Sequence, residues 1–182
     1  MFNWAIILMV FGRSLKCLYI LYYYYMFGID TMAWTKLFML YDPDIGKPLT
    51  LLLSETQFFI TKDVEKELYH YYPSKEKKWG SGAIFPRLSR SFQKYISKGF
   101  DEADASLLEY AEDPEHIIIT EDGEMLAENV TKRNNIIHLI DMVKIYHEER
   151  LLSKREFREV LVWFRRKKNI TKRKFEKFLE RL

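Results

Sequence analysis

The sequence predicts an α/β fold: a three-layer α/β/α sandwich with a mainly parallel central sheet of about four to five strands and a helical carboxyl-terminal end. Short β-branched or aromatic runs alternate along the chain with longer segments of helical periodicity. The run Ile117 to Ile119 places three β-branched residues in succession, which is typical of a strand buried on both faces. Strands that alternate with helices favour crossover connections and therefore a parallel sheet.

Length and composition predict one globular domain, at residues 26–182. The chain has 182 residues, enough for a sizeable core, and is 48% hydrophobic and 30% charged, which excludes a disordered chain. Residues 1–25 are expected to be an apolar extension, interrupted by Arg13 and Lys16 so that neither part reaches the ~20 residues of a spanning helix. The favoured interpretation places the true start near Met26. Contact with a membrane is expected only if the extension is translated.

The first half of the domain is predicted to alternate strands and helices. Asp42-Pro43 ends the first helix because proline cannot continue one, and Thr61 can cap a later helix. In order, we expect a strand at 22–30, a helix from 31 to 41, a short helix at 49–53, a strand at 56–60, a helix at 62–71 and a loop at 73–86.

The second half is predicted to finish the sheet and to end in helices. Asp101 can cap one of these helices, and Ser153 with Glu156 has the spacing of a capping box. In order, we expect helices at 88–98 and 101–111, a strand at 117–119, a helix at 125–133, a strand at 136–139, and helices at 140–150, 156–167 and 172–182.

Acidic side chains recur where the predicted strands end and the helices begin. Asp30 follows the first strand, and Asp122 lies just past the strand at 117–119. Glu102 and Asp104 open the helix at 101–111, and Glu67 lies on the helix at 62–71. The carboxyl ends of parallel strands share one edge, where open α/β sheets bind ligands. A capping box and a polar turn are the alternative explanations of these acids.

Carboxylates that gather without a balancing arginine repel one another. A divalent cation removes this repulsion, and oxygen-only ligands favour Mg²⁺ or Mn²⁺ over zinc. Such a site can activate water for phosphodiester hydrolysis. Cys17 is the single cysteine, which excludes an intrachain disulfide, and the four histidines lack metal-ligand spacing. A chain without disulfides is expected in a reducing cytoplasm.

Basic residues are concentrated at the carboxyl-terminal end. Residues 151–182 hold twelve basic and four acidic residues, a net charge of +8, which leaves −5 for the rest of a chain of net charge +3. The densest run is Arg165, Arg166, Lys167 and Lys168. It is the candidate RNA-binding segment, because cations bind phosphates. A solvated helix face is the alternative.

From Phe27 to Leu182 the chain resembles the PIN domains of archaea and bacteria. Four motifs carry the resemblance: GIDTMAW, FFITKDVEKEL, GFDEADASLLEYA and HIIITEDGEM. The helical end LLSKREFREVLVWFRRKKNITKRKFEKFL also resembles one subgroup. Many members have Asp-Thr-Asn or Asp-Ser-Ser within the first motif, where this chain has Asp30, Thr31 and Met32.

The resemblance implies a metal-dependent endoribonuclease that hydrolyses single-stranded RNA. Asp30, Glu67, Asp104 and Asp122 are then the catalytic residues and the Mg²⁺ or Mn²⁺ ligands, and Thr31, Glu102 and Thr120 support them. It further implies a homodimer and, as in many members, the toxin of a toxin–antitoxin pair. The alternative is a catalytically inactive PIN-like module that binds RNA or a protein.

Overall fold

The computed structural model describes residues 26–40, 58–72, 83–88, 91–128, 135–180 and 182 of the chain. The predicted extension at 1–25 and the predicted helix at 49–53 lie outside these residues. So do the first residues of the strand expected at 22–30 and the end of the helix expected at 125–133.

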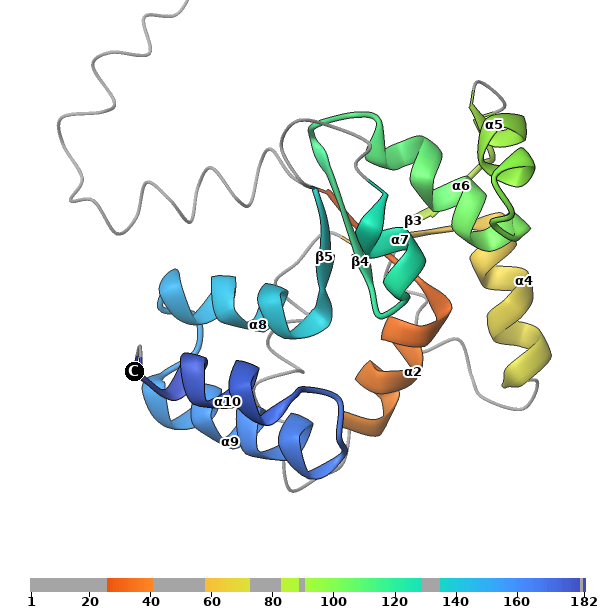
Figure 1. Ribbon diagram of the computed structural model, residues 1–182. Helices are drawn as coiled ribbons and strands as arrows, with labels where there is room; N and C mark the ends of the chain where they lie inside the picture. Colours follow the sequence, from red (N-terminus) through yellow and green to blue (C-terminus); the bar gives the residue numbers. More distant parts are fainter. Residues whose placement is uncertain (1–25, 41–57, 73–82, 89–90, 129–134, 181) are drawn as a thin grey trace, which may run out of the picture.

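The described residues form an α/β fold around one all-parallel sheet of five strands, as the sequence predicts (Figure 1). The strands are β1 (Met26–Ile29), β2 (Phe58–Thr61), β3 (Ala83–Phe85), β4 (His116–Thr120) and β5 (Ile136–His138), in the spatial order β3-β2-β1-β4-β5. β1 is therefore central, between β2 and β4. Three of its four residues are buried, as is every residue of β2, which explains the apolar runs in the sequence.

Helices cover both faces of the sheet and make the three layers. The helices are α2 (Thr31–Leu40), α4 (Lys62–Tyr71), α5 (Phe92–Ser97), α6 (Glu102–Ala111), α7 (Gly123–Ala127), α8 (Leu139–Glu148), α9 (Lys154–Arg166) and α10 (Lys172–Leu179). Figure 1 shows α8, α9 and α10 together on the side of the sheet where α2 lies. On the other side α6 packs on β1, β2 and β4, with α4 and α5 against it.

Three predicted segments differ from the structure. In place of the helix predicted at 125–133, α7 covers Gly123–Ala127, and Glu128 after it has an extended backbone. The loop predicted at 73–86 contains β3, a short and mostly exposed strand whose backbone pairs with β2. The helix that the structure shows in the segment predicted at 88–98 is α5, Phe92–Ser97, and Leu88 is not helical. The buried carboxylate of Glu109 accepts hydrogen bonds from the backbone N–H groups of Leu88 (3.1 Å), Ser91 (2.9 Å) and Phe92 (2.9 Å). It thereby satisfies N–H groups that the start of a helix leaves free.

Gly28 is required at the centre of the sheet. Its register partners are Phe59 on β2 and Ile118 on β4. A Cβ atom at this position would lie 2.6 Å from Phe59 Cζ and 2.7 Å from Ile118 Cδ1. Both neighbouring side chains are fully buried, so they meet over β1 only because residue 28 has no side chain.

The carboxyl-terminal helices are amphipathic and pack as the sequence predicts. The predicted capping box of Ser153 and Glu156 is present at the start of α9. The buried stripe of α9 includes Phe157, Val160 and Phe164, and the ring of Phe157 contacts Phe178 of α10. Among the described helices, none has the length and apolar character needed to cross a membrane.

Candidate functional site

The centre of the site is the carboxyl edge of the sheet, where β1 lies between β2 and β4. Asp30 is the first residue after β1, and its N–H donates to the carbonyl of Ile119 on β4 (3.1 Å). Thr61 ends β2 and Thr120 ends β4. Since the strands are parallel and adjacent, these three residues line one edge, as expected from the sequence.

The carboxylate of Asp30 is buried and held at both oxygens. Oδ1 accepts the N–H of Ala33 (2.5 Å), and Oδ2 accepts the hydroxyl of Thr120 and the N–H of Glu121 (3.2 Å). Burial raises the pKa of Asp30 to about 6, even though these hydrogen bonds favour the charged form. These hydrogen bonds therefore fix the orientation of the Asp30 side chain at the middle of the sheet edge.

Glu67 reaches the edge from α4. Thr61 caps this helix by accepting the N–H of Val64 (3.3 Å), as predicted. Glu67 Oε2 accepts the hydroxyl of Thr31 (2.6 Å), which joins α4 to the start of α2 beside Asp30. Burial raises the pKa of the Glu67 carboxyl, and the nearby charge of Asp101 raises it further.

Asp104 has an unpaired carboxylate at the start of α6. Asp101 is the cap of this helix, as predicted, and its Oδ1 accepts the N–H of Asp104 (2.9 Å). The side chain of Asp104 has no hydrogen bond or ion pair within the described part of the chain. Ser106 on the same helix is hydrogen-bonded to Thr61 at the end of β2 (2.6 Å between the hydroxyl oxygens), so α6 is fixed to the sheet edge.

Four other carboxylates act on Asp104. Its pKa is raised to about 7, first by burial and then by neighbouring negative charges. In descending order these charges belong to Asp101, Asp30, Asp122 and Glu67. Asp104 is the residue on which the charges of the other three candidate ligands converge. Asp30, Glu67, Asp104 and Asp122 are referred to below as the acidic cluster.

Asp122 both caps a helix and faces the acidic cluster. Its Oδ1 accepts the N–H groups of Glu124 (2.7 Å) and Met125 (3.0 Å), so Asp122 caps the start of α7. The hydroxyl of Thr120 accepts the N–H of Asp122 (2.9 Å) and donates to Asp30. Thr120 thus connects two members of the cluster.

Glu102 lies apart from the cluster. Its carboxylate is exposed and lies 3.1 Å from Arg87 Nη2 and 4.0 Å from Lys66 Nζ. Arg87 also binds both carboxylate oxygens of Asp63 (2.7 and 3.1 Å) and lies over the ring of Phe92. Of the three supporting residues expected from the sequence, Thr31 and Thr120 contact cluster members, whereas Glu102 pairs with cations. Met32, the departure in the first motif, has an exposed side chain.

A partly buried ion pair that the sequence does not predict lies beside the cluster. Glu121 pairs with Lys36 of α2 and accepts the N–H of Leu139 at the start of α8 (3.1 Å). Burial alone would raise the pKa of Glu121, but the nearby His138 ring (3.9 Å) and the hydrogen bond from Lys36 outweigh it, so the pKa is lowered. Glu121 follows β4 as Asp30 follows β1, so its place at the sheet edge could be predicted from the sequence. The sequence does not indicate that Lys36 is its partner.

The candidate RNA-binding residues are at the end of α9. Arg165, Arg166, Lys167 and Lys168 are all exposed, while the apolar residues of α9 face the core. Lys168 has a positive φ (58°), which ends the helix. The predicted arrangement, with apolar stripes inward and cations outward, is therefore confirmed; what these cations bind is a separate question.

The acidic cluster combines an excess of negative charge with oxygen-only donors. These are the donors that Mg²⁺ and Mn²⁺ prefer, so the residues fit such an ion chemically. Within the described ranges, no three His, Cys, Asp or Glu side chains are close enough together to hold one ion. A magnesium ion needs oxygens at ~2.1 Å, so these side chains would have to move closer together to bind one ion.

No model of a protein family matches this chain, and a search of curated proteins finds no similar sequence. The function is therefore inferred from the residues and their arrangement.

Proposed function

We propose that this protein is a PIN-like endoribonuclease that hydrolyses single-stranded RNA at a Mg²⁺ or Mn²⁺ site formed by the acidic cluster. The observation that supports this most is Asp104: an unpaired, partly buried carboxylate with four acids acting on it. A residue with a purely structural role has no need of such surroundings, which destabilise the ionised form. Strongly perturbed carboxylates in one place are typical of functional sites.

In this proposal Asp30, Glu67, Asp104 and Asp122 hold the ion after their side chains draw closer together around it. Asp30 is already fixed, because both of its oxygens are hydrogen-bonded. Thr120 and Thr31 orient Asp30 and Glu67, and Ser106 anchors the helix that carries Asp104. The bound ion would supply a water of lowered pKa and stabilise the leaving oxygen of the cleaved phosphodiester.

The wider biological setting is part of the same proposal. The motifs that resemble PIN domains favour a homodimer and an antitoxin partner that restrains the nuclease. A single cysteine favours a reducing cytoplasm. The exposed cations Arg165 to Lys168 are suited to hold the RNA backbone, because phosphate contacts need charge but no base recognition.

The test is Asp30→Asn, with Glu102→Gln as the matched control. Both remove one carboxylate charge, but Glu102 pairs with Arg87 and Lys66, outside the cluster. We expect the wild-type protein to cleave a single-stranded RNA with Mg²⁺ or Mn²⁺ and to stop in excess EDTA. Asp30→Asn should abolish cleavage, and Glu102→Gln should keep it. The reaction is followed by gel electrophoresis of end-labelled RNA.

A second measurement separates lost binding of the ion from lost chemistry. Titration of Mn²⁺, followed by calorimetry, should show binding to the wild type and to Glu102→Gln and much weaker binding to Asp30→Asn. Cleavage that persists in EDTA would refute the metal mechanism. Binding of RNA without any cleavage would instead favour the inactive PIN-like module.

A further inference from the structure

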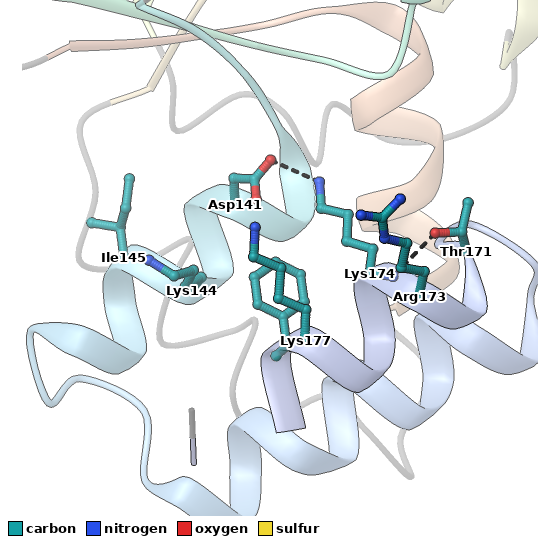
Figure 2. A pocket seen from close by; sticks show the side chains of 8 residues that line it. Asp141, Lys144, Ile145, Thr171, Arg173, Lys174 and Lys177 are labelled. Atoms are coloured by element: carbon teal, nitrogen blue, oxygen red, sulfur yellow. Dashed lines mark hydrogen bonds and ion pairs between the residues drawn. The ribbon is translucent and has the colours of Figure 1, made fainter. Parts of the chain in front are cut away.

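A pocket of about 590 Å³ lies between α8 and α10, apart from the acidic cluster. Figure 2 shows the side chains of Lys174 and Lys177 extending from α10 toward Asp141 on α8. Ligand sites in proteins span roughly 300–1,000 Å³, so this pocket has room for a nucleotide unit. Its lining residues are Asp141, Lys144, Ile145, Thr171, Arg173, Lys174, Lys177 and Phe178.

The lining of this basic pocket is strongly cationic. It holds four basic side chains and a single acid, Asp141, which is paired with Lys174 (2.9 Å). Lys144 is paired with Glu148 (2.6 Å). Arg173 and Lys177 have no ion-pair partner within the part of the chain that the structure describes. Two uncompensated cations therefore face the same space.

Arg173 also lies in the first turn of α10. This turn contains no acidic residue, and Thr171 caps it by accepting the N–H of Lys174 (3.1 Å). The start of a helix carries a partial positive charge that attracts anions. Guanidinium groups bind phosphate through two parallel hydrogen bonds, and lysine adds a point charge. The chemistry of the pocket is that of a phosphate site.

One lining residue of the basic pocket, Asp141, lies close in sequence to the edge of the sheet that carries the acidic cluster. β5 pairs with β4 so that His138 is opposite Thr120, and α8 begins at the next residue, Leu139. Glu121 accepts the N–H of Leu139 (3.1 Å), which fixes the start of α8 to the turn that carries Asp122. Asp141 lines the pocket and is in the first turn of α8, which directly follows β5. β5 is the neighbour of β4 in the sheet, and Asp122 of the acidic cluster follows β4.

We propose that the basic pocket binds backbone phosphates of the RNA strand next to the cleaved linkage, with Arg173 and Lys177 as the contacting residues. This rests on the proposed function, because it takes the strand to be the substrate of the acidic cluster. It adds a second and separate contact surface to the exposed cations of α9. Its cations hold the strand in place and read no sequence, since phosphates carry no base information.

The test uses two charge-matched double variants and measures binding alone. Arg173→Gln with Lys177→Gln removes the two unpaired cations of the pocket. Arg158→Gln with Lys172→Gln removes two exposed cations of α9 and α10 that do not line it. Fluorescence anisotropy of a labelled single-stranded RNA is recorded in EDTA over a series of salt concentrations, so that no cleavage occurs.

We expect the pocket variant to bind RNA more weakly and with a flatter dependence on salt. Each neutralised phosphate contributes about 0.7 to the slope of log K against log salt for a single strand, so removal of both cations lowers its magnitude by about 1.4. The control variant should keep the wild-type slope. The proposal would be overturned if all three proteins had the same salt slope, or if both variants reduced the magnitude of that slope equally.

Competition with inorganic phosphate identifies the source of the phosphate. For a strand site, added phosphate should weaken RNA binding no more than chloride of the same ionic strength does, in the wild type and in the pocket variant alike. Displacement that requires Arg173 and Lys177, without a change in the RNA salt slope, would assign the pocket to a free phosphate compound and overturn the strand proposal. Binding is measured in EDTA and does not depend on cleavage. A protein that binds RNA through the pocket but does not cleave it would therefore contradict the proposed function and still support RNA binding by the pocket.

Discussion

At the scale of single residues, Asp101 and Asp104 show how two neighbouring acids take different roles. Asp101 accepts an N–H of α6 and stabilises the helix start. Asp104 makes no such bond, and burial together with the surrounding negative charge disfavours its ionised form. A cap contributes about 1 kcal/mol to stability, so Asp101→Ala should be destabilising by that amount. Asp104 should behave in the opposite way.

We predict that Asp104→Asn stabilises the metal-free protein at alkaline pH. The pKa of Asp104 is raised from 3.8 to about 7, so the folded state binds the proton more tightly than the unfolded state. Between these two values the folded protein holds more protons, and its stability falls as pH rises. The variant should therefore have a higher Tm than the wild type near ~pH 8, and the difference should shrink toward ~pH 4.

Thermal unfolding in EDTA across this pH range checks the prediction, with Asp101→Ala as the comparison. Addition of Mg²⁺ should raise the Tm of the wild type and leave Asp104→Asn nearly unchanged. A destabilised Asp104→Asn at alkaline pH, with metal binding like that of the wild type, would mean that Asp104 supports the helix and binds no ion.

At the scale of elements, the central strand depends on the close approach of its two neighbours. The side chains of Phe59 on β2 and Ile118 on β4 both occupy the space beside Gly28. The ring of Phe59 is also stacked on Phe85 (4.6 Å between centroids) and lies against Tyr110. This packing holds Phe59 in place, so the centre of the sheet tolerates no added carbon at residue 28.

We predict that Gly28→Ala destabilises the fold by about 1–3 kcal/mol, the usual cost of overpacking a core. Gly123→Ala is the matched control, because a Cβ there would meet no atom within 4 Å and the residue begins α7. The control should be neutral or slightly stabilising. Urea denaturation of both variants measures the difference. Equal stabilities would show that β2 and β4 separate easily.

Elements could be predicted from the sequence where a local signal determines them. The apolar run that ends at Asp30 predicts β1, and the side chains of Thr61, Asp101 and Ser153 predict the helix starts that the structure shows. β3 could not be predicted, because its exposed residues have no period and its formation depends on pairing with β2. The hydrogen bonds from the start of α5 to Glu109 likewise join residues far apart in the sequence.

The acidic cluster could be predicted because local signals also determine where its members lie. Asp30 and Asp122 follow strands, and parallel strands bring their ends to one edge whatever the remaining topology. The position of Glu102 was not predictable, because its pairing with Arg87 is set by the packing of the segment after β3 against α6. The ion pair of Glu121 with Lys36 joins residues 85 positions apart, which no local pattern indicates.

At the scale of the whole molecule, opposite charges occupy different regions. The acidic cluster lies at the sheet edge, whereas the last residues of the chain carry the net charge of +8. The exposed segment Arg165 to Lys168 and the basic pocket are both in this carboxyl-terminal part. Such a division can attract an RNA strand to one surface while its cleaved linkage meets the ion at another.

We predict that replacing Arg165, Arg166, Lys167 and Lys168 by glutamine flattens the salt dependence of RNA binding. The slope should fall by up to about 2.8, or about 0.7 for each phosphate that is no longer neutralised. Cleavage positions should not change, because phosphate contacts do not select bases. Lys154→Gln with Arg155→Gln and Arg158→Gln, at the other end of α9, is the control. A slope equal to that of the wild type would leave the segment as a solvated face or an antitoxin-docking surface.

The strand order has a consequence for synthesis of the protein. β1 occupies the middle of the sheet, yet its Met26 pairs with His116, 90 residues further along the chain. At roughly 5–20 residues per second, a ribosome needs about 5–18 s to make that partner. Until then the nascent β1 has one unpaired apolar edge, of the kind that attracts other chains. The sheet can close only late in translation, so a chaperone that shields this edge should increase the yield of folded protein.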